Sequence, residues 1–161
     1  VNALIHLARR RIVLVTPYFV PDDATLSALR IAALSGVDVQ LIVSATSNAR
    51  LTAWAQEAYY DELLRSGVRI ALYEPHFLHA KHLSVDEDIA LLGSINLDIR
   101  SFALNAEVGL LCYDRKIVRQ LLDIEDDYLR NSRPLELSQW RKRATWRRSR
   151  EGIARLADAL M

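Results

Sequence analysis

Cysteine is nearly absent from this sequence of 161 residues, and the single one, Cys112, excludes an internal disulfide. Without a second thiol, it also gives no support to a structural zinc site. No apolar run reaches the roughly 18 residues that a membrane-spanning helix needs, and no secretory signal pattern is visible at the start. The first residue is Val1 rather than methionine, so we expect the sequence to be a piece of a longer protein.

Glycine and proline are also scarce, with 5 and 4 residues, which excludes collagen-like repeats. Hydrophobic residues make up 51% of the sequence and charged residues 25%, a balance typical of soluble globular domains rather than of disordered chains or coiled coils. The length is sufficient for one domain with a sizeable core. No linker or internal repeat divides the sequence, so we expect residues 1–161 to form a single domain.

Charge is unevenly distributed along the sequence. Residues 1–132 carry 13 Lys or Arg against 17 Asp or Glu, a net charge of −4, whereas residues 133–161 carry 8 against 3, a net charge of +5. Trp140 and Trp146 stand among the basic residues, which predicts a basic helical tail at about 135–161 that can rest on anionic lipid headgroups. A solvated helix that packs back on the domain explains the tail equally well. The acidic body argues against an extended nucleic-acid groove.

Apolar runs rich in β-branched residues alternate with amphipathic stretches, a pattern that indicates an α/β domain with a partly parallel sheet. We expect a first helix that is capped by Asp22 or Asp23, reaches Ser35 and stops at Gly36. Two further helices are expected at 51–66, closed by Gly67, and at 114–131, with Pro134 separating the latter from the tail. The predicted strands lie at 11–16, 37–44, 68–74, 79–85, 89–93 and 107–113, and those at 79–85 and 89–93 form a hairpin that turns at 86–88.

Three of the four histidines, His76, His79 and His82, lie close together in the sequence. Because they fall on or beside an extended segment, His79 and His82 face apart, and we reject a metal cluster. His79 and Lys81 instead share one face of the predicted strand. A lysine can neutralise phosphoryl oxygens while an imidazole attacks phosphorus or moves a proton, so this pair suits chemistry on a phosphate ester.

The pair opens a longer pattern, H-x-K-x4-D-x6-G-S-x-N, formed by His79, Lys81, Asp86, Gly93, Ser94 and Asn96. A chance match to six fixed residues in a chain of this length is roughly one in a million. Ser94 and Asn96 can offer donors to phosphate oxygens beside Lys81. Asp86 belongs to the same set of catalytic candidates, but it stands an odd number of residues from His79 and Lys81. We therefore expect its side chain to face away and to fix the turn or pair with a neighbouring donor.

This pattern resembles the signature of the phospholipase D superfamily, whose members transfer phosphatidyl or phosphodiester groups through a covalent phosphohistidine. Residues 16–23, 30–43, 59–70, 77–86 and 93–108 are similar to the second half of bacterial cardiolipin synthases, as are LDIRS at 97–101 and the basic tail. The resemblance implies a phospholipase D-like domain with a mixed, mostly parallel sheet and helices on both faces. It also implies that Glu107 holds the second ring nitrogen of His79, completing a catalytic set of His79, Lys81, Asp86 and Glu107 beside phosphate-binding Lys81, Ser94 and Asn96.

The activity implied by the resemblance is phosphatidyl transfer between two phosphatidylglycerol molecules, which yields cardiolipin and glycerol without a metal or another cofactor. Such enzymes need two signatures that meet, and this sequence holds one. We expect the missing N-terminal half, or a second copy of the chain, to supply the other. The implied location is the surface of the bacterial cytoplasmic membrane, with anchors in segments outside this sequence.

Other functions remain open at this stage. A one-motif phosphodiesterase, nuclease or phospholipase D that works as a homodimer needs the same residues. A non-catalytic module that binds anionic lipid ranks lower, because a pure binder has no need of His79, Lys81, Asn96 and Glu107 together. A metal-dependent hydrolase ranks lower still.

Overall fold

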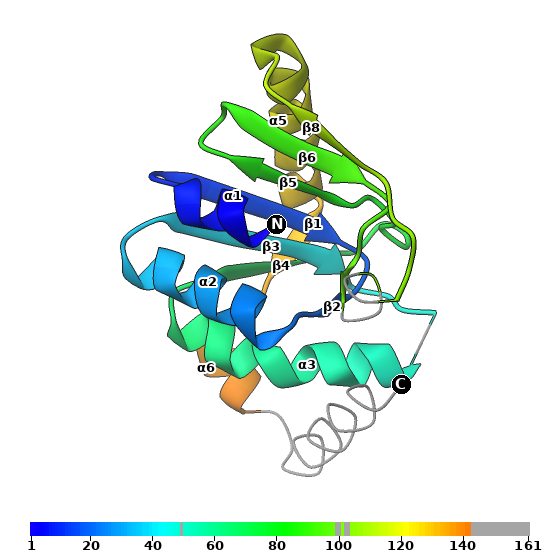
Figure 1. Cartoon of the computed structure of the whole chain (residues 1–161). Coiled ribbons are helices and arrows are strands. Elements are labelled where there is room, and N and C mark those ends of the chain that lie inside the picture. Colours follow the sequence, from blue (N-terminus) through cyan, green and yellow to red (C-terminus); the bar gives the residue numbers. More distant parts are fainter. Residues whose placement is uncertain (49, 99–100, 102–103, 143–161) are drawn as a thin grey trace.

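The strands predicted at the start of the sequence form the centre of a seven-stranded sheet in the computed structural model, which describes residues 1–48, 50–98, 101 and 104–142. Strand β1 (Arg11–Thr16) pairs in parallel with β3 (Asp38–Ser44), and β3 pairs in parallel with β4 (Arg69–Tyr73). The strand order is β8-β6-β5-β1-β3-β4-β9 (Figure 1). The sheet is mixed and has helices on both faces, as predicted.

The remaining pairings of this sheet are antiparallel, so the expectation of a mostly parallel sheet is wrong. Strands β5 (His82–Val85), β6 (Ile89–Gly93) and β8 (Gly109–Cys112) form an antiparallel run beside β1. Strand β9 (Ser132–Pro134) pairs antiparallel with β4 at the opposite edge. The turn between β5 and β6 is too short for the crossover that parallel strands require, and the hairpin therefore reverses the chain.

Helices α1 (Asn2–Leu7), α2 (Asp23–Leu34) and α3 (Arg50–Arg65) lie on one face of the sheet, and α5 (Arg115–Arg130) covers the other (Figure 1). The caps follow the prediction: Asp22 accepts a 2.8 Å hydrogen bond from the backbone N–H of Thr25, and Asp114 caps α5 in the same way. Helices α2 and α3 end just before Gly36 and Gly67, as predicted. Helix α1 is too short for a clear periodic signal, and the sequence did not predict it.

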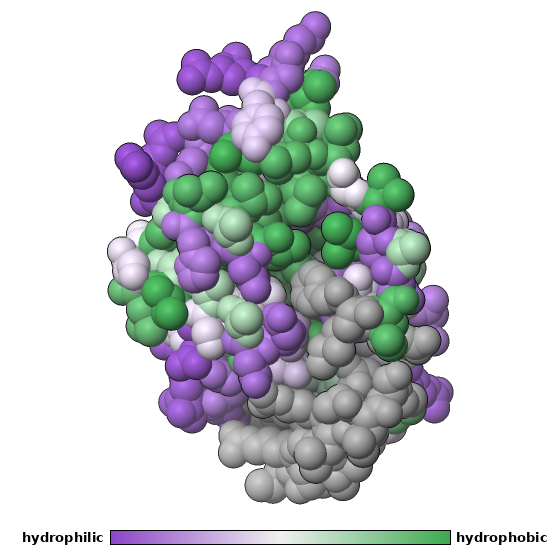
Figure 2. Space-filling model, in the orientation of Figure 1, coloured by the Kyte–Doolittle hydropathy of each residue, from purple (hydrophilic) through white to green (hydrophobic). Residues whose placement is uncertain are grey.

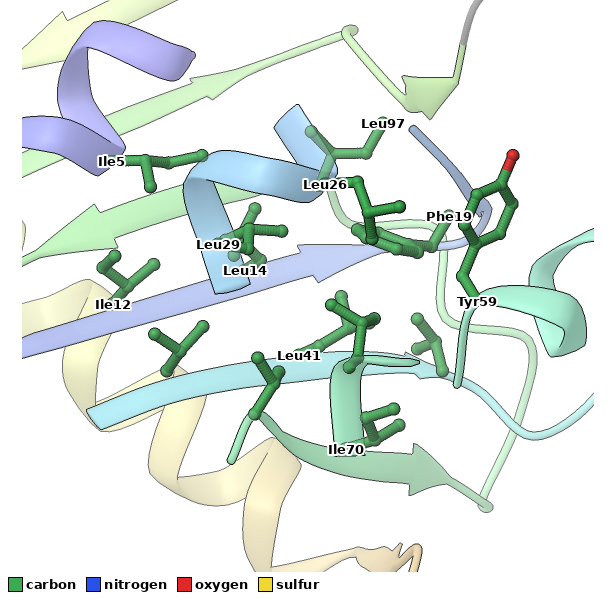
Figure 3. Close-up of a cluster of buried hydrophobic side chains, with 14 of the residues drawn as sticks. Ile5, Ile12, Leu14, Phe19, Leu26, Leu29, Leu41, Tyr59, Ile70 and Leu97 are labelled. Carbon is green, nitrogen blue, oxygen red and sulfur yellow. The ribbon is translucent and has the colours of Figure 1, made fainter. Parts of the chain in front are cut away.

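Side chains from both faces of the sheet are buried in separate clusters. Figure 3 shows the larger cluster between the sheet and the first three helices, which includes Ile12 and Leu14 of β1 and Leu29 of α2. On the opposite face Val13 and Val15 of β1 belong to a second cluster, against which residues of α5 pack. Alternate residues of β1 thus serve opposite layers, which explains why this strand is apolar at almost every position.

The C-terminal region is described as far as residue 142. Pro134 stands between α5 and the predicted tail, as expected, and it ends the edge strand β9, where its missing N–H costs no ladder bond. The short helix α6 (Leu137–Arg141) follows, and Trp140 packs on Tyr60 of α3 with ring centroids 5.3 Å apart. Residues 143–161, with Trp146 and most of the basic cluster, lie outside the described residues. Among the helices that are described, none has the length and apolarity needed to cross a membrane.

Candidate active site

The segment that carries His79 and Lys81 is extended but is not part of a strand, because β5 begins only at His82. The register pairs His82 with Val15, and Pro17 follows the end of β1, so the preceding residues have no partner on that side. Side chains nevertheless alternate along the segment: Leu78 is buried in the cluster on the α5 side of the sheet, with Ala80 packed against it. His79 and Lys81 therefore share the other face, as the sequence predicted.

His79 and Lys81 are in direct contact. The Lys81 Nζ lies 3.1 Å from His79 Nε2 and donates a 2.9 Å hydrogen bond to the His79 backbone carbonyl. An ammonium group can only donate, so a hydrogen bond between these two side chains requires a free lone pair on Nε2. An unprotonated Nε2 is the form of imidazole that can attack phosphorus or accept a proton.

The pKa of Lys81 is lowered from its usual value because the side chain is partly buried, although the carboxylates of Glu107 and Asp98 act in the opposite direction. Burial removes water from the ammonium and disfavours its charged form. A phosphate group placed beside Lys81 would meet a cation that is incompletely solvated, and its attraction would be stronger than at an open surface.

Two aromatic residues beside His79 were not among the predicted site residues. The Phe77 ring centroid lies 5.8 Å from that of His79, and Tyr18, just after β1, lies 5.9 Å from Phe77. Phe77 stands two positions before His79 in an extended segment. The alternation that paired His79 with Lys81 therefore also signalled Phe77 as a neighbour.

Ser94 connects the end of β6 to the start of β8. Its hydroxyl donates a short hydrogen bond to Glu107 Oε2 and accepts a 3.0 Å bond from the Val108 backbone N–H. The Ser94 backbone N–H in turn donates to the Val108 carbonyl at 2.9 Å. Ser94 thus holds Glu107 in place in this structure, while its predicted contact with phosphate oxygens stays a prediction.

Gly93 is required by the close approach of the same two strands. A Cβ atom at this position would lie 2.2 Å from the Val108 carbonyl oxygen and 2.9 Å from the Gly109 Cα. Since both of these are backbone atoms, no side-chain movement can make room. The glycine of the signature therefore allows β6 and β8 to close, and this closure brings Ser94 to Glu107.

Glu107 lies just before β8 rather than inside the strand predicted at 107–113. The hydrogen bond from Ser94 is the main cause of a lowered pKa of Glu107, and Lys81 contributes at longer range. The expected contact between Glu107 and the second ring nitrogen of His79 is not seen, because within the described residues no hydrogen bond joins these two side chains. The carboxylate instead binds the nearer Ser94 hydroxyl, while His79 Nε2 faces Lys81.

Asn96 lies between β6 and the two-residue strand β7 (Leu97–Asp98), which pairs in parallel with β2 (Phe19–Val20). The buried hydroxyl of Thr16 accepts a 3.4 Å hydrogen bond from the Leu97 N–H and so ties this stretch to the end of β1. Asn96 Oδ1 is buried, and no group in the described part of the chain donates to it. An amide oxygen can only accept a hydrogen bond, so this atom does not serve phosphate oxygens, and the predicted donation from the Asn96 amide to phosphate stays a prediction.

Asp86 lies at the opposite end of β5, where the hairpin turns. Its carboxylate accepts hydrogen bonds of 2.7, 2.7 and 2.8 Å from the backbone N–H groups of Arg9, Arg10 and Arg11. Burial acts to raise the pKa of Asp86, but these three bonds outweigh it and the pKa is lowered. These contacts agree with the expectation that the Asp86 side chain faces away from His79 and fixes the turn. Its place among the catalytic candidates stays a prediction.

The described residues contain no group of three or more His, Cys, Asp or Glu side chains that could hold a metal ion. His76, the other histidine of the rejected cluster, contacts Tyr73, with ring centroids 5.1 Å apart. His82 points to the α5 side of the sheet. His76, His79 and His82 therefore have different neighbours and do not point toward one another.

Comparison with known proteins decides the family. The profile described as "Cardiolipin synthase, PLD-like domain" matches residues 1–127. The chain belongs to this family. It is 42% identical over 159 residues to cardiolipin synthase 2 of Bacillus anthracis, covering 99% of the chain but 31% of that protein. The chain thus spans about a third of the length of this relative.

Two solved structures share the fold at low sequence identity. The phospholipase D family member Nuc from Salmonella typhimurium has a TM-score of 0.73 at 21% identity, over 84% of this chain and 88% of Nuc. Phosphatidylserine synthase from Haemophilus influenzae Rd KW20 has a TM-score of 0.77 at 19% identity, over 99% of this chain and 42% of the synthase. The predicted phospholipase D-like fold is confirmed.

Proposed function

We propose that this chain is the C-terminal catalytic half of a cardiolipin synthase that transfers a phosphatidyl group between two phosphatidylglycerol molecules. The observation that carries the proposal is the 42% identity to a protein named cardiolipin synthase across 99% of the chain. The His79 and Lys81 side chains, 3.1 Å apart on one face, supply the chemistry that such a transfer needs. The proposed catalytic residues are His79, Lys81 and Glu107, with Ser94 and Asn96 beside the phosphate.

The transfer takes two displacements at phosphorus. In the first, a histidine nitrogen forms a bond to phosphorus while the bond to the glycerol oxygen breaks, and a second histidine gives its proton to the departing glycerol. In the second, that histidine takes the proton of an incoming phosphatidylglycerol hydroxyl. The new P–O bond then forms as the P–N bond breaks. Lys81 stays cationic beside the phosphoryl oxygens throughout.

His79 takes one of these two histidine roles, and the protonation of glycerol is the one we assign to it in a two-motif protein. The other histidine comes from the N-terminal half of the longer protein. In a homodimer, two copies of His79 would share the roles. In the two-motif protein the histidine of the N-terminal half is therefore the nucleophile. It carries the phosphatidyl group between the two displacements.

The surface beside the site supports a covering protein partner. Leu91 of β6 lies opposite Leu111 of β8, and Leu111 is 40% exposed. Lys81, Leu91 and Ile95 line one small cavity. The apolar surface formed by Leu91 and Leu111 therefore adjoins the proposed catalytic lysine. Figure 2 shows hydrophobic side chains gathered over β6 and β8 on the face in view. A partner half that covers this surface would bring its histidine to His79 and also exclude water, which favours transfer over hydrolysis.

The substrate places the protein at a membrane. Phosphatidylglycerol is an anionic lipid, and the region from 133 onward carries a net charge of +5. We propose that the chain works at the surface of the bacterial cytoplasmic membrane, with the basic tail facing the headgroups. Anchoring segments would lie in the part of the longer protein that this chain does not span.

The test uses the longer protein that contains this chain, with the chain alone as a second sample. Vesicles of phosphatidylglycerol are incubated with each sample in EDTA, and lipids are analysed by mass spectrometry. We expect cardiolipin and free glycerol in equal amounts from the longer protein. The same samples are incubated with plasmid DNA as a control for the nuclease function.

Three other outcomes would each contradict the proposal. Cleavage of DNA without lipid turnover would favour the one-motif nuclease. Formation of phosphatidic acid without cardiolipin would indicate a hydrolase. Vesicle binding without any chemistry, even in the longer protein, would leave a lipid-binding module.

A further inference from the structure

A buried polar cluster lies directly behind the catalytic face, and the reaction described above does not use it. His82 follows Lys81 in the sequence but points to the opposite side of the sheet, where α5 covers it. Its exposed fraction is 8%, and that of Glu125 on α5 is 0%. Burying a carboxylate costs free energy unless polar groups surround it. The buried position of Glu125 therefore calls for a specific explanation.

The contacts of the cluster join β5 to α5. His82 Nε2 lies 3.2 Å from Glu125 Oε1, a close contact without the angles of a hydrogen bond, and the Ser84 hydroxyl donates a 3.0 Å hydrogen bond to Glu125 Oε2. One carboxylate thus spans two successive inward-facing residues of the same strand. The register of α5 along β5 is set by this arrangement, because a shift of either element would separate the pairs.

Aromatic rings fix the orientation of His82 from another side. The Tyr128 ring lies nearly parallel to that of His82, with centroids 6.4 Å apart and an interplanar angle of 25°. Tyr73 of β4 packs edge-on against Tyr128 at 5.4 Å. His82 is therefore held between a carboxylate and a ring that both come from α5.

The position of Lys81 depends on this anchor. A single peptide bond separates His82 from Lys81, and the Lys81 carbonyl accepts a 3.2 Å hydrogen bond from the Gly93 N–H. Strand β5 starts only at His82, so the catalytic segment before it has no ladder partner on the β1 side. A displacement of His82 would pass directly to Lys81 and to its 3.1 Å contact with His79.

We propose that His82 and Glu125 form a positioning pair that fixes Lys81 and His79 from behind the sheet. Neither residue touches the substrate. The Ser84–Glu125 hydrogen bond and the close His82–Glu125 contact define one geometry, whereas apolar packing of similar volume would stabilise the same layers without a unique register. The activity readout of this proposal rests on the proposed function, but the geometry it describes does not.

The decisive variant replaces the cluster by apolar side chains: Ser84→Ala, His82→Leu and Glu125→Met together. Because no buried polar group is left unpaired, this triple variant is expected to fold with undiminished stability. Glu125→Gln is the conservative partner, which keeps shape and hydrogen-bonding capacity. Val118→Ala is the control, since Val118 is a buried α5 residue that packs beside Ala90 and Cys112. It should destabilise α5 without disturbing His82.

Two readouts separate positioning from stability. The first is the imidazole Cε1–H resonance of His79 in the histidine-labelled chain, which reports the Lys81 contact without any substrate. The second is the kcat and KM of lipid transfer by the longer protein. In the triple variant we expect the His79 resonance to move and kcat to fall about 10- to 100-fold with KM unchanged. The single variant Glu125→Gln should keep most of the parent's kcat, and Val118→Ala should leave both readouts unchanged.

The possible outcomes are distinct. A folded triple variant with an unmoved His79 resonance overturns the proposal, whether or not kcat falls. An equal effect of Val118→Ala also overturns it, because the cluster would then act through stability alone. A shifted resonance in a protein whose parent makes no cardiolipin would support the positioning pair and contradict the proposed function instead.

Discussion

The two ends of the signature differ in what holds them. At one end His79 is exposed and Lys81 only partly buried, and they contact each other and leave polar atoms free for a substrate. At the other end the Asp86 carboxylate is fully occupied by three backbone N–H groups. The same short motif thus carries the proposed reactive groups at one end of β5 and a carboxylate bound to the backbone at the other.

The difference shows how a sequence motif should be interpreted. Residues that belong to one sequence pattern need not act together in the structure, because a strand directs its side chains to opposite faces and separates its two ends. The first end should govern rate, and the second should govern stability. The following predictions test this separation.

The largest effect is expected for His79→Gln. Glutamine keeps polarity but cannot accept a proton or form a phosphoramidate, so lipid transfer by the longer protein should fall about 10³-fold. The free energy of unfolding in urea should change by less than about 0.5 kcal/mol, because the side chain is exposed. A variant that retains substantial transfer would remove His79 from the catalytic set.

Asp86→Asn should show the opposite profile. It keeps one acceptor oxygen and suits the positive φ of 53° at this position, but it loses the charge and the Oδ2 acceptor. We expect a loss of about 1–2 kcal/mol in the free energy of unfolding at pH 7. The transfer rate per folded molecule should stay the same.

The Asp86→Asn effect should depend on pH with a definite sign. The pKa of Asp86 is lower in the folded state than the unfolded value of about 3.9, so its contribution is complete above that value. It is lost as the pH falls through the folded-state pKa. Urea titrations should therefore show parent and variant converging below about pH 4, and Asp88→Asn is the matched control. A gap that does not narrow as the pH falls below about 4 would contradict this account.

The smallest effect is expected at the turn itself. Asp86 and Glu87 both have positive φ, and the Asp88 N–H donates to the Val85 carbonyl at 3.1 Å, as in a type I′ hairpin turn. Glu87→Gly should relieve backbone strain and stabilise the chain by up to about 1 kcal/mol, or a few degrees in Tm. Glu87→Ala should give no gain. Any change in transfer rate would show that the two ends are coupled.

Most of the fold was accessible from local pattern. Strands β1, β3 and β4, helices α2, α3 and α5, and the hairpin at 86–88 follow from apolar runs, caps and turn residues that act over a few positions. Strands β2, β7 and β9 were missed, because each is only two or three residues long and exists through pairing with distant partners. The parallel share of the sheet was overestimated because β5 pairs with β1, and β8 with β6, across long stretches of sequence, and no local pattern records the direction of such pairings.

The sequence by itself determined which chemistry is available: alternation placed His79 beside Lys81 and turned Asp86 away, and the signature fixed the family. Only the tertiary structure showed what each group contacts. It joined Glu107 to Ser94 through the approach of β6 and β8, and it buried Glu125 against His82 across a long interval of sequence. Local periodicity decides the direction of a side chain, but its neighbours depend on how distant segments pack.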